Sequence, residues 1–266
     1  MAPQIPHHTH IPRFHDLSCC SWFCGIRCCW FGGDLVMTEI LLVRHARSSA
    51  NASGVLAGRV KGVHLDETGK DQAKQLSLAL ANVPITGLVS SPLDRCMETA
   101  RAIGANHPNI SVTKNSDLIE MDYGLWSGLK LSVLSKRKEW SAIQSTPSQV
   151  RFPEGESFLE MNARVNQAID DVFAQYSKGK KRQIIAIFTH GDVIKAIIAH
   201  SLGLHLDAFQ KIVVDPASVS ILRQEGNSRF VISQNIRADG IESSLGVRKS
   251  AATVGGGDGS SNSRVR

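Results

Sequence analysis

The chain has 266 residues, of which 42% are apolar and 20% charged, and its formal net charge at pH 7 is +6. This composition is ordinary for a globular protein and excludes a disordered chain. No run approaches the roughly 20 apolar residues that span a bilayer, which excludes a membrane protein. The basic residues are scattered and form no stripe interleaved with aromatic residues, so a small anionic partner explains the positive excess as well as a polyanion, and we expect no nucleic acid and no membrane as partners.

Residues 1–36 show neither a helical nor an alternating apolar period. They also lack the basic start, apolar run and small-residue cleavage site of a secretory signal, so we expect a cytoplasmic protein. Five of the six cysteines crowd into this segment: Cys19, Cys20, Cys24, Cys28 and Cys29. Because no second ligand pair stands at the distance a zinc site needs, we expect no metal there. The segment is expected to be a disordered or non-native extension that precedes an initiator at Met37.

From residue 38 onward, short apolar runs alternate with helical periodicity, which predicts one three-layer α/β domain over residues 37–238. The predicted strands, in chain order, are 40–43, 85–90, 110–113 at an edge, 184–188, and a closing hairpin of 218–222 and 230–233. The predicted helices are 66–81, one from Pro92 toward Gly104 with Ser91 as its cap, one or two short ones in 129–150, then 156–176 and 191–202. The tail, residues 239–266, is rich in glycine and serine and is expected to be disordered.

Charged segments follow two of the predicted buried strands, at the place where α/β sheets gather their ligands. The first carries Arg44 and His45, and the second carries His190. A lone histidine after a strand is most often structural, but two at strand ends, one of them beside an arginine, favour catalysis. Arg95 follows a third strand at the positive end of a helix, where a cation makes more sense if a dianion lies between them.

These segments together resemble the histidine phosphatase (phosphoglycerate mutase-like) superfamily over residues 39 to about 235. The motifs that carry the resemblance are Arg44-His45-Ala46, Ser90-Ser91-Pro92-Leu93-Asp94-Arg95 with Thr99 and Ala100, and Thr189-His190-Gly191-Asp192. The runs 62–66 and 213–220 are similar to those of small actinobacterial proteins described as phosphoglycerate mutase family proteins or phosphomutases. The resemblance implies a three-layer α/β/α sandwich with a mostly parallel central sheet, and phosphoryl transfer without a metal or cofactor.

The resemblance also implies roles for single residues. His45 matches the histidine that attacks phosphorus, a reaction for which neutral imidazole is available near pH 7. Arg44, Arg95 and His190 match the phosphate pocket, and Glu120 matches the acid that protonates the departing oxygen.

Other candidates are less sharply defined. Asn51 matches an amide that donates to the same phosphate, and Gly191 belongs to the same phosphate-binding set. Ser48 either contributes to that set or caps a turn. Asp122 competes with Glu120 for the role of acid. His64 is expected to be a turn or core histidine.

Three functions remain open from the sequence. Hydrolysis of a small phosphate monoester is favoured over phosphoglycerate mutase activity, because primer-dependent mutases resemble longer chains and the region between Gly128 and Glu156 is short. A non-catalytic relative that binds phosphorylated ligands is the third, and the joint presence of the five matched catalytic residues argues against it. Departures from the family pattern at Ala46, Arg47 and Ser127 leave the substrate open, and the oligomeric state is not readable.

Overall fold

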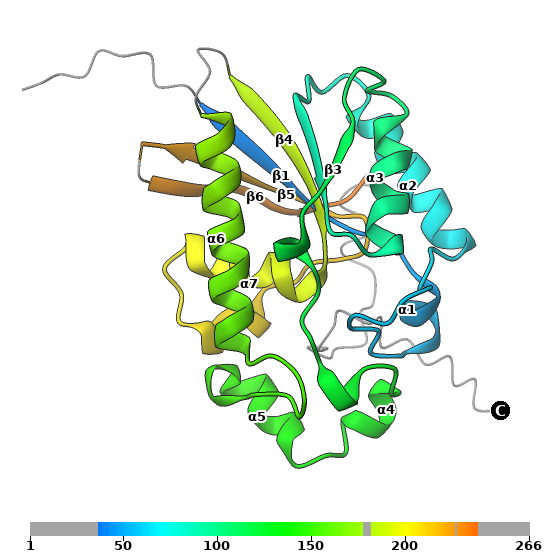
Figure 1. Cartoon of the computed structure of the whole chain (residues 1–266), viewed down its shortest axis with the longest axis vertical. Coiled ribbons are helices and arrows are strands. Elements are labelled where there is room, and N and C mark those ends of the chain that lie inside the picture. The colour runs from blue at the N-terminus through cyan, green and yellow to red at the C-terminus, as the bar shows by residue number, and fades with distance from the viewer. Residues whose placement is uncertain (1–36, 178–181, 227, 239–266) are drawn as a thin grey trace, which may run out of the picture. The chain divides into compact units, whose positions relative to one another are not determined.

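The computed structural model describes residues 37–177, 182–226 and 228–238 (Figure 1). The chain divides into two units, 1–33 and 34–266, and all described residues lie in the second. The expectations for residues 1–36, with their five cysteines, and for the tail 239–266 fall outside the described residues.

The centre of the domain is a six-stranded sheet in the order β3-β2-β4-β1-β5-β6. The strands are β1 (Thr38–Arg44), β2 (Gly87–Ser90), β3 (Val112–Lys114), β4 (Gln183–Thr189), β5 (Val219–Glu225) and β6 (Ser228–Ile236). The first four run parallel to one another, while β5 is antiparallel to both β1 and β6. The expected α/β fold with a mostly parallel sheet is confirmed, and the predicted hairpin closes one edge.

Helices cover both faces of this sheet (Figure 1). They are α1 (Ser49–Ser53), α2 (Glu67–Leu80), α3 (Asp94–Gly104), α4 (Leu131–Leu134), α5 (Glu139–Ser145), α6 (Phe158–Tyr176) and α7 (Gly191–Ser201). Alternate side chains of β1 enter two cores because a strand points successive residues to opposite faces. Leu42 packs in the cluster that includes α6 and α7, and Val43 in the one that includes α2 and α3.

Side-chain caps define where the helices begin. Asp66 caps α2, because its Oδ1 accepts from the Gly69 amide at 2.7 Å. Ser157 caps α6 with a reciprocal capping box, so α6 begins at Phe158, two residues later than the sequence predicts. The predicted Ser91 cap is wrong. The helix α3 begins at Asp94 and its N-cap residue, Leu93, makes no side-chain cap, while Ser91 is used in the candidate site described below.

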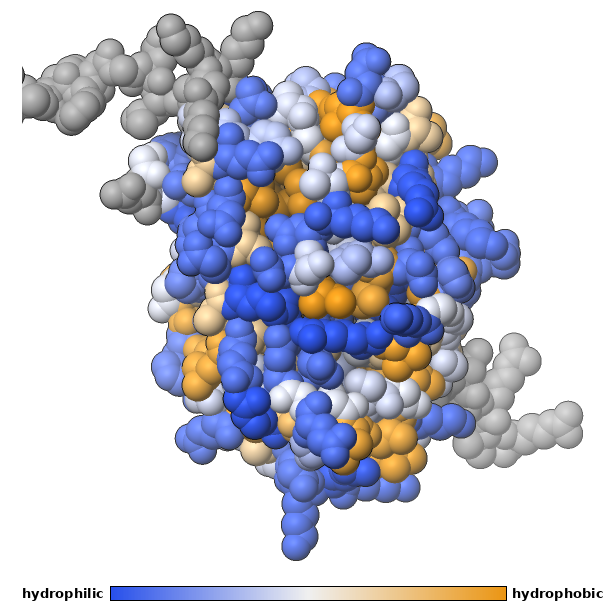
Figure 2. All heavy atoms as spheres, viewed as in Figure 1, coloured by the Kyte–Doolittle hydropathy of each residue, from blue (hydrophilic) through white to orange (hydrophobic). Residues whose placement is uncertain are grey.

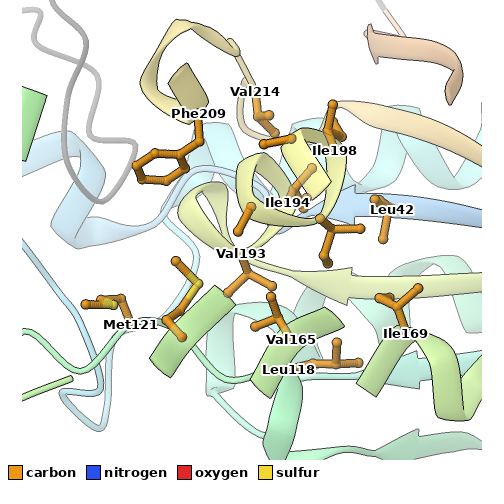
Figure 3. Close-up of a cluster of buried hydrophobic side chains, with 14 of the residues drawn as sticks. Leu42, Leu118, Met121, Val165, Ile169, Val193, Ile194, Ile198, Phe209 and Val214 are labelled. Atoms are coloured by element: carbon orange, nitrogen blue, oxygen red, sulfur yellow. The ribbon is translucent and has the colours of Figure 1, made fainter. Parts of the chain in front are cut away.

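A long connection, residues 115–157, joins β3 to α6 and contains α4, α5 and three short 3₁₀ turns. Its first part is anchored by buried apolar residues, and Figure 3 shows Leu118 and Met121 in one cluster with Val165 of α6 and Val193 of α7. On the face shown in Figure 2, hydrophilic side chains predominate over small groups of apolar ones. Within the described ranges no helix combines the length and apolar character needed to cross a membrane.

Candidate active site

The two histidines of the sequence motifs meet because β1 and β4 are parallel neighbours in register. Arg44, the last residue of β1, lies opposite Thr189, the last residue of β4. The next residues are therefore brought together at the same edge of the sheet, and the His45 amide donates to the Thr189 carbonyl at 2.9 Å. The imidazole rings of His45 and His190 lie edge to face, with their centroids 5.3 Å apart.

His45 is buried, with 3% of its surface exposed. Its Nδ1 lies 2.8 Å from the Ala46 carbonyl oxygen. A carbonyl only accepts, so Nδ1 carries the proton and the lone pair is on Nε2. Burial lowers the pKa of His45 well below its usual value, and the charges of Arg95 and Arg44 lower it further. The ring is thus held neutral with its lone pair on Nε2, the atom that can act as a nucleophile once the lone pair is released.

Arg95 is the centre of the cationic part of the site. It is buried, its Nε donates to His45 Nε2 at 3.2 Å, and its Nη2 donates to the Gly58 carbonyl at 2.9 Å. Its Nη1 is also buried, and within the described structure it has no hydrogen-bond partner. A buried guanidinium donor left unpaired is costly, so this group is suited to receive an anion.

Arg44 supplies the second buried cation. Its Nη1 donates to the Val214 carbonyl at 2.7 Å, and its amide donates to the Ser218 carbonyl at 3.1 Å. The same loop contacts the nucleophile, because the Ala217 amide donates to the His45 carbonyl at 3.3 Å. The loop between residues 213 and 219 thereby holds Arg44 and His45 as a unit.

His190 is fully buried and contacts groups from three other segments. Its Nδ1 lies 3.2 Å from Arg95 Nη2 and 3.7 Å from Glu120 Oε2, and its Nε2 lies 2.8 Å from Ser91 Oγ. Because a guanidinium only donates, Nδ1 accepts, and Nε2 therefore donates to the Ser91 hydroxyl. Burial lowers the pKa of His190 well below its usual value, and Arg95 is the largest charge acting in the same direction.

Glu120 is brought into this group, with 3% of its surface exposed. Its Oε1 accepts from the Met121 amide at 3.0 Å. Burial, aided by the charge of Asp192, raises the pKa of Glu120 to about 7 against the opposing charges of Arg95 and Arg44. A carboxyl group with that pKa can both give and take a proton near neutrality.

Asp122, which competes with Glu120 for the role of acid, lies in a more exposed environment. Its side chain is 36% exposed and pairs with Arg59 Nη1 at 3.3 Å. It also accepts from the Gly124 amide at 3.0 Å. The structure therefore brings Glu120, and not Asp122, up to His190.

The secondary phosphate-binding candidates follow the ends of the same two strands, Ser48 and Asn51 after β1 and Gly191 after β4. Ser48 caps α1, and Asn51 returns a hydrogen bond through Oδ1, which accepts from Ser48 N at 3.0 Å and from Ser48 Oγ at 2.8 Å. The carbonyl end of the Asn51 amide is thus engaged, so its NH₂ end is the one that could serve an anion. Gly191 is the first residue of α7, whose amino end carries partial positive charge.

Two other charged residues near the motifs are paired with neighbours. Arg47, a departure from the family pattern, donates from Nε to Asp66 Oδ2 at 2.8 Å. His64 is not a core residue, since its side chain is 59% exposed and pairs with Glu98. Neither is brought to His45.

Sequence reasoning missed three residues that the structure places around the matched ones. Ser91 stands inside a recognised motif but was assigned to a helix cap. Tyr123 and Asp192 lie near Glu120 and His190 in sequence, and their side chains are joined by a hydrogen bond of 2.8 Å. The only sequence signal for these residues was that they are polar and lie next to the motifs. That signal does not show which side chain each of them contacts.

The assembled groups are a neutral imidazole nucleophile, two buried guanidinium ions, a second neutral imidazole and a carboxyl group that is protonated in part at neutrality. Such a set suits nucleophilic attack on an anionic tetrahedral centre with protonation of the departing group. Among the described residues, no group of three or more His, Cys, Asp or Glu side chains is arranged to hold a metal ion.

A family model described as the histidine phosphatase superfamily (branch 1) matches residues 40–237. The chain is similar to phosphoserine phosphatase 1 of Hydrogenobacter thermophilus, with 31% identity over 202 residues that cover 75% of this chain and 93% of that protein. It is similar to a 2,3-bisphosphoglycerate-dependent phosphoglycerate mutase of Rhizobium etli, with 31% identity over 172 residues, 60% of this chain and 78% of that one. An uncharacterized protein of Mycobacterium tuberculosis is 33% identical over 139 residues, 50% of this chain and 65% of that one.

Solved structures share the fold. The alpha-ribazole phosphatase of Shigella flexneri superimposes with a TM-score of 0.66 at 25% identity, over 75% of this chain and 96% of that one. YhfR of Bacillus stearothermophilus superimposes with a TM-score of 0.69 at 22% identity, over 76% of this chain and 98% of that one.

Proposed function

The chain belongs to the histidine phosphatase superfamily, branch 1, and on that basis we propose that it hydrolyses a small phosphate monoester through a phosphohistidine formed on His45. The activity resides in residues 37–238 and requires no metal or cofactor.

In the first step Nε2 of His45 attacks the phosphorus atom. An N–P bond forms while the bond between phosphorus and the ester oxygen breaks, and Glu120 gives its proton to the departing oxygen. Arg44, Arg95 and the NH₂ group of Asn51 donate to the equatorial oxygens, whose charge they stabilise in the transition state.

In the second step water attacks the phosphohistidine. The ionised Glu120 takes a proton from this water, the N–P bond breaks, and the electron pair returns to Nε2 of His45. Inorganic phosphate leaves and Glu120 is protonated again, so the enzyme regains its starting state.

The observation that carries the proposal is the state of His45. Its Nδ1 is fixed as the protonated nitrogen by the Ala46 carbonyl, and burial with two adjacent guanidinium ions keeps Nε2 unprotonated. A histidine with a low pKa between buried cations would be a poor general acid, but it is a good nucleophile toward an anion that those cations bind.

Hydrolysis is favoured over mutase activity by two observations. The alignment with the phosphoserine phosphatase covers 93% of that protein, against 78% of the phosphoglycerate mutase. Within the connection of residues 115–157, the segment between Gly128 and Glu156 is also short and holds only α4, α5 and one 3₁₀ turn. Phosphoserine is therefore the first substrate to test, and phosphoglycerate mutase activity is the second candidate.

The test is phosphate release by the full-length chain in EDTA, against phosphoserine, other alkyl phosphates and p-nitrophenyl phosphate, with a coupled phosphoglycerate mutase assay beside it. We expect release that survives EDTA and is lost in His45→Ala. Mutase turnover without release would promote the second candidate. Silence in both assays, or full activity in His45→Ala, would overturn the proposal.

A further inference from the structure

A buried polar cluster that the proposed reaction does not use lies beside Glu120. Tyr123 donates its hydroxyl proton to Asp192 Oδ2 at 2.8 Å. Lys195 Nζ lies 3.4 Å from the other carboxylate oxygen, Oδ1, and donates to Gln210 Oε1 at 2.9 Å. We call these four residues the Asp192 cluster.

The members of the Asp192 cluster are almost completely enclosed. Tyr123 and Asp192 are 0% exposed, Lys195 is 5% and Gln210 is 6%. Burying a carboxylate and an ammonium ion is costly and often stabilises a fold no better than apolar residues would. The cluster therefore calls for an explanation other than stability.

The positions of Tyr123 and Asp192 in the chain suggest such an explanation. Tyr123 lies three residues after Glu120 in the long connection, and Asp192 lies two residues after His190 at the start of α7. Their hydrogen bond thus joins the two short segments that carry Glu120 and His190, whose side chains are 3.7 Å apart.

We propose that the hydrogen bond between Tyr123 and Asp192 is a positioning device, which fixes the segment carrying Glu120 against α7 and so aims its carboxyl group at the departing oxygen. This inference rests on the function proposed above and adds two positioning residues to it. Neither of them touches the substrate.

The ring of Tyr123 supports the same arrangement from a second side. It packs edge to face against Phe152, with centroids 5.1 Å apart. Gly58 lies so close that an added Cβ would stand 3.0 Å from Tyr123 Cδ2. The carbonyl of Gly58 accepts from Arg95, so Tyr123 also backs the loop that orients this arginine.

The negative charge of Asp192 has a separate, electrostatic effect. Burial, and after it the charge of Asp192, raises the pKa of Glu120, while the charges of Arg95 and Arg44 lower it. Arg59 faces the Glu120 backbone, where its Nε donates to the carbonyl at 2.9 Å.

Other titratable groups in the same environment are Cys96, His190 and Lys195. Burial raises the pKa of the Cys96 thiol to about 12, so the thiol stays neutral. His190 Nδ1 lies 3.7 Å from Glu120 Oε2, and the lowered pKa of His190 keeps its ring neutral. Lys195 Nζ lies 3.4 Å from Asp192 Oδ1, where its charge partly balances the carboxylate. Removal of the Asp192 charge therefore lowers the pKa of Glu120 and ionises the acid at a lower pH.

The test compares Tyr123→Phe with Tyr176→Phe, on an alkyl phosphate and on p-nitrophenyl phosphate. Tyr176, the other tyrosine of the chain, is a matched control because it lies beside Gly87 at the opposite, amino end of β2. We expect Tyr123→Phe to lower kcat on the alkyl ester by about tenfold and on the aryl ester by less than about twofold, because only the poor leaving group needs the aimed acid. KM should not change, and Tyr176→Phe should match the wild type.

Asp192→Asn provides a second readout, the pH profile of kcat. Its decline at high pH should begin at lower pH than in the wild type, whereas in Tyr123→Phe the Asp192 charge remains and this decline should stay in place. If Asp192→Asn does not fold, the comparison of Tyr123→Phe with Tyr176→Phe on the two esters still tests the inference. In a Glu120→Gln background Tyr123→Phe should add no further selective loss on the alkyl ester, because the group it positions is gone.

Three outcomes would overturn the inference while the proposed function stands: equal losses on both esters, identical rates in Tyr123→Phe and wild type, or additive losses with Glu120→Gln. Failure of the proposed function itself is distinguishable, since the wild type would then release no phosphate from either ester.

Discussion

The candidate site draws its groups from two regions that are built differently. Arg44, His45 and His190 lie at the ends of adjacent parallel strands, in a sheet whose ladder fixes their spacing. Glu120 lies in the connection from residue 115 to 157, where short turns replace the ladder and side chains hold the backbone. The first region is positioned by the fold, and the second by a few particular contacts.

The contacts of the second region form a compact ion-pair cluster. Arg59 Nη2 pairs with Glu156 at 2.9 Å, and Arg164 Nε pairs with the same carboxylate at 2.9 Å. Arg164 Nη1 also donates to the Ile119 carbonyl at 3.1 Å, directly before Glu120. Substitutions in the two regions should therefore have different kinetic signatures, uniform in the first and dependent on the leaving group in the second.

The largest effect is expected from Arg95→Lys, in the first turn of α3, whose guanidinium donates to His45 of the strand-end region. Lysine keeps the charge but loses the planar fork that serves His45, the Gly58 carbonyl and the phosphoryl oxygens at once. We expect kcat/KM to fall by about 10²–10³-fold on alkyl and aryl esters alike. Steady-state rates on both substrates measure this loss, and the residual rate of His45→Ala gives the lower limit for comparison. A loss below tenfold, or one confined to alkyl esters, would contradict the uniform signature.

A large but selective effect is expected from Glu120→Gln. The amide fills the same space but cannot protonate the departing oxygen, so alkyl phosphates should lose about 10²-fold or more in kcat. p-Nitrophenyl phosphate, whose leaving group needs little protonation, should lose far less. A plot of log kcat against leaving-group pKa should be steeper than for the wild type, and equal losses across the series would make Glu120 structural.

A smaller effect is expected from Arg59→Lys, which removes the fork that contacts Glu120 O, Asp122 and Glu156. A loosened segment should lower kcat on alkyl esters by about three- to tenfold, since small misplacements of a catalytic group are costly. Arg151→Lys is the matched control, because it alters an ion pair with Glu160 in which both side chains are more than half exposed. If both variants behave alike, the ion pairs do not position Glu120.

The smallest effect is on stability and comes from the raised pKa of Glu120. Its carboxyl group ionises near 4.5 in the unfolded chain and at about 7 in the folded protein. The folded state keeps a proton that the unfolded chain has released, so this group makes the protein less stable as pH rises from about 4.5 to 7. The cost is fully present above pH 7.

Glu120→Gln removes that cost because glutamine does not titrate. The melting temperature of the variant relative to the wild type should therefore be higher at pH 8 than at pH 5, by about 2–4 °C for each kcal/mol gained. Thermal unfolding at the two pH values measures it. A difference that is the same at both would show that Glu120 is not held protonated by its surroundings.

The same contrast between regions explains how far the sequence could be interpreted. The strand runs 40–43 and 184–188 were predicted within two residues of their observed ends, because fully buried strands leave a clear apolar signal. The histidines that follow them were then placed at one edge of the sheet by topology alone. The expected three-layer fold was confirmed for the same reason, and the family was confirmed because the polar motifs that follow these strands carry its pattern.

The side-chain partners in the second region had no such signal. Nothing periodic marks Tyr123 as the partner of Asp192, since 69 residues separate them in the chain. Ser91 was misassigned because a serine before a helix is most often a cap. It lies three positions before the start of α3, and its hydroxyl is bonded instead to the fully buried ring of His190.

The hydrogen bond from Arg95 Nε to His45 Nε2 has a consequence for inhibition by product. A phosphoryl group needs both the donor and the lone pair that this bond joins, so inorganic phosphate has to break it just as the substrate does. The free energy of the bond is therefore subtracted from the affinity for both, which favours departure of the product at the end of each cycle. The enzyme should therefore tolerate higher phosphate concentrations than one in which this bond between Nε and Nε2 is absent.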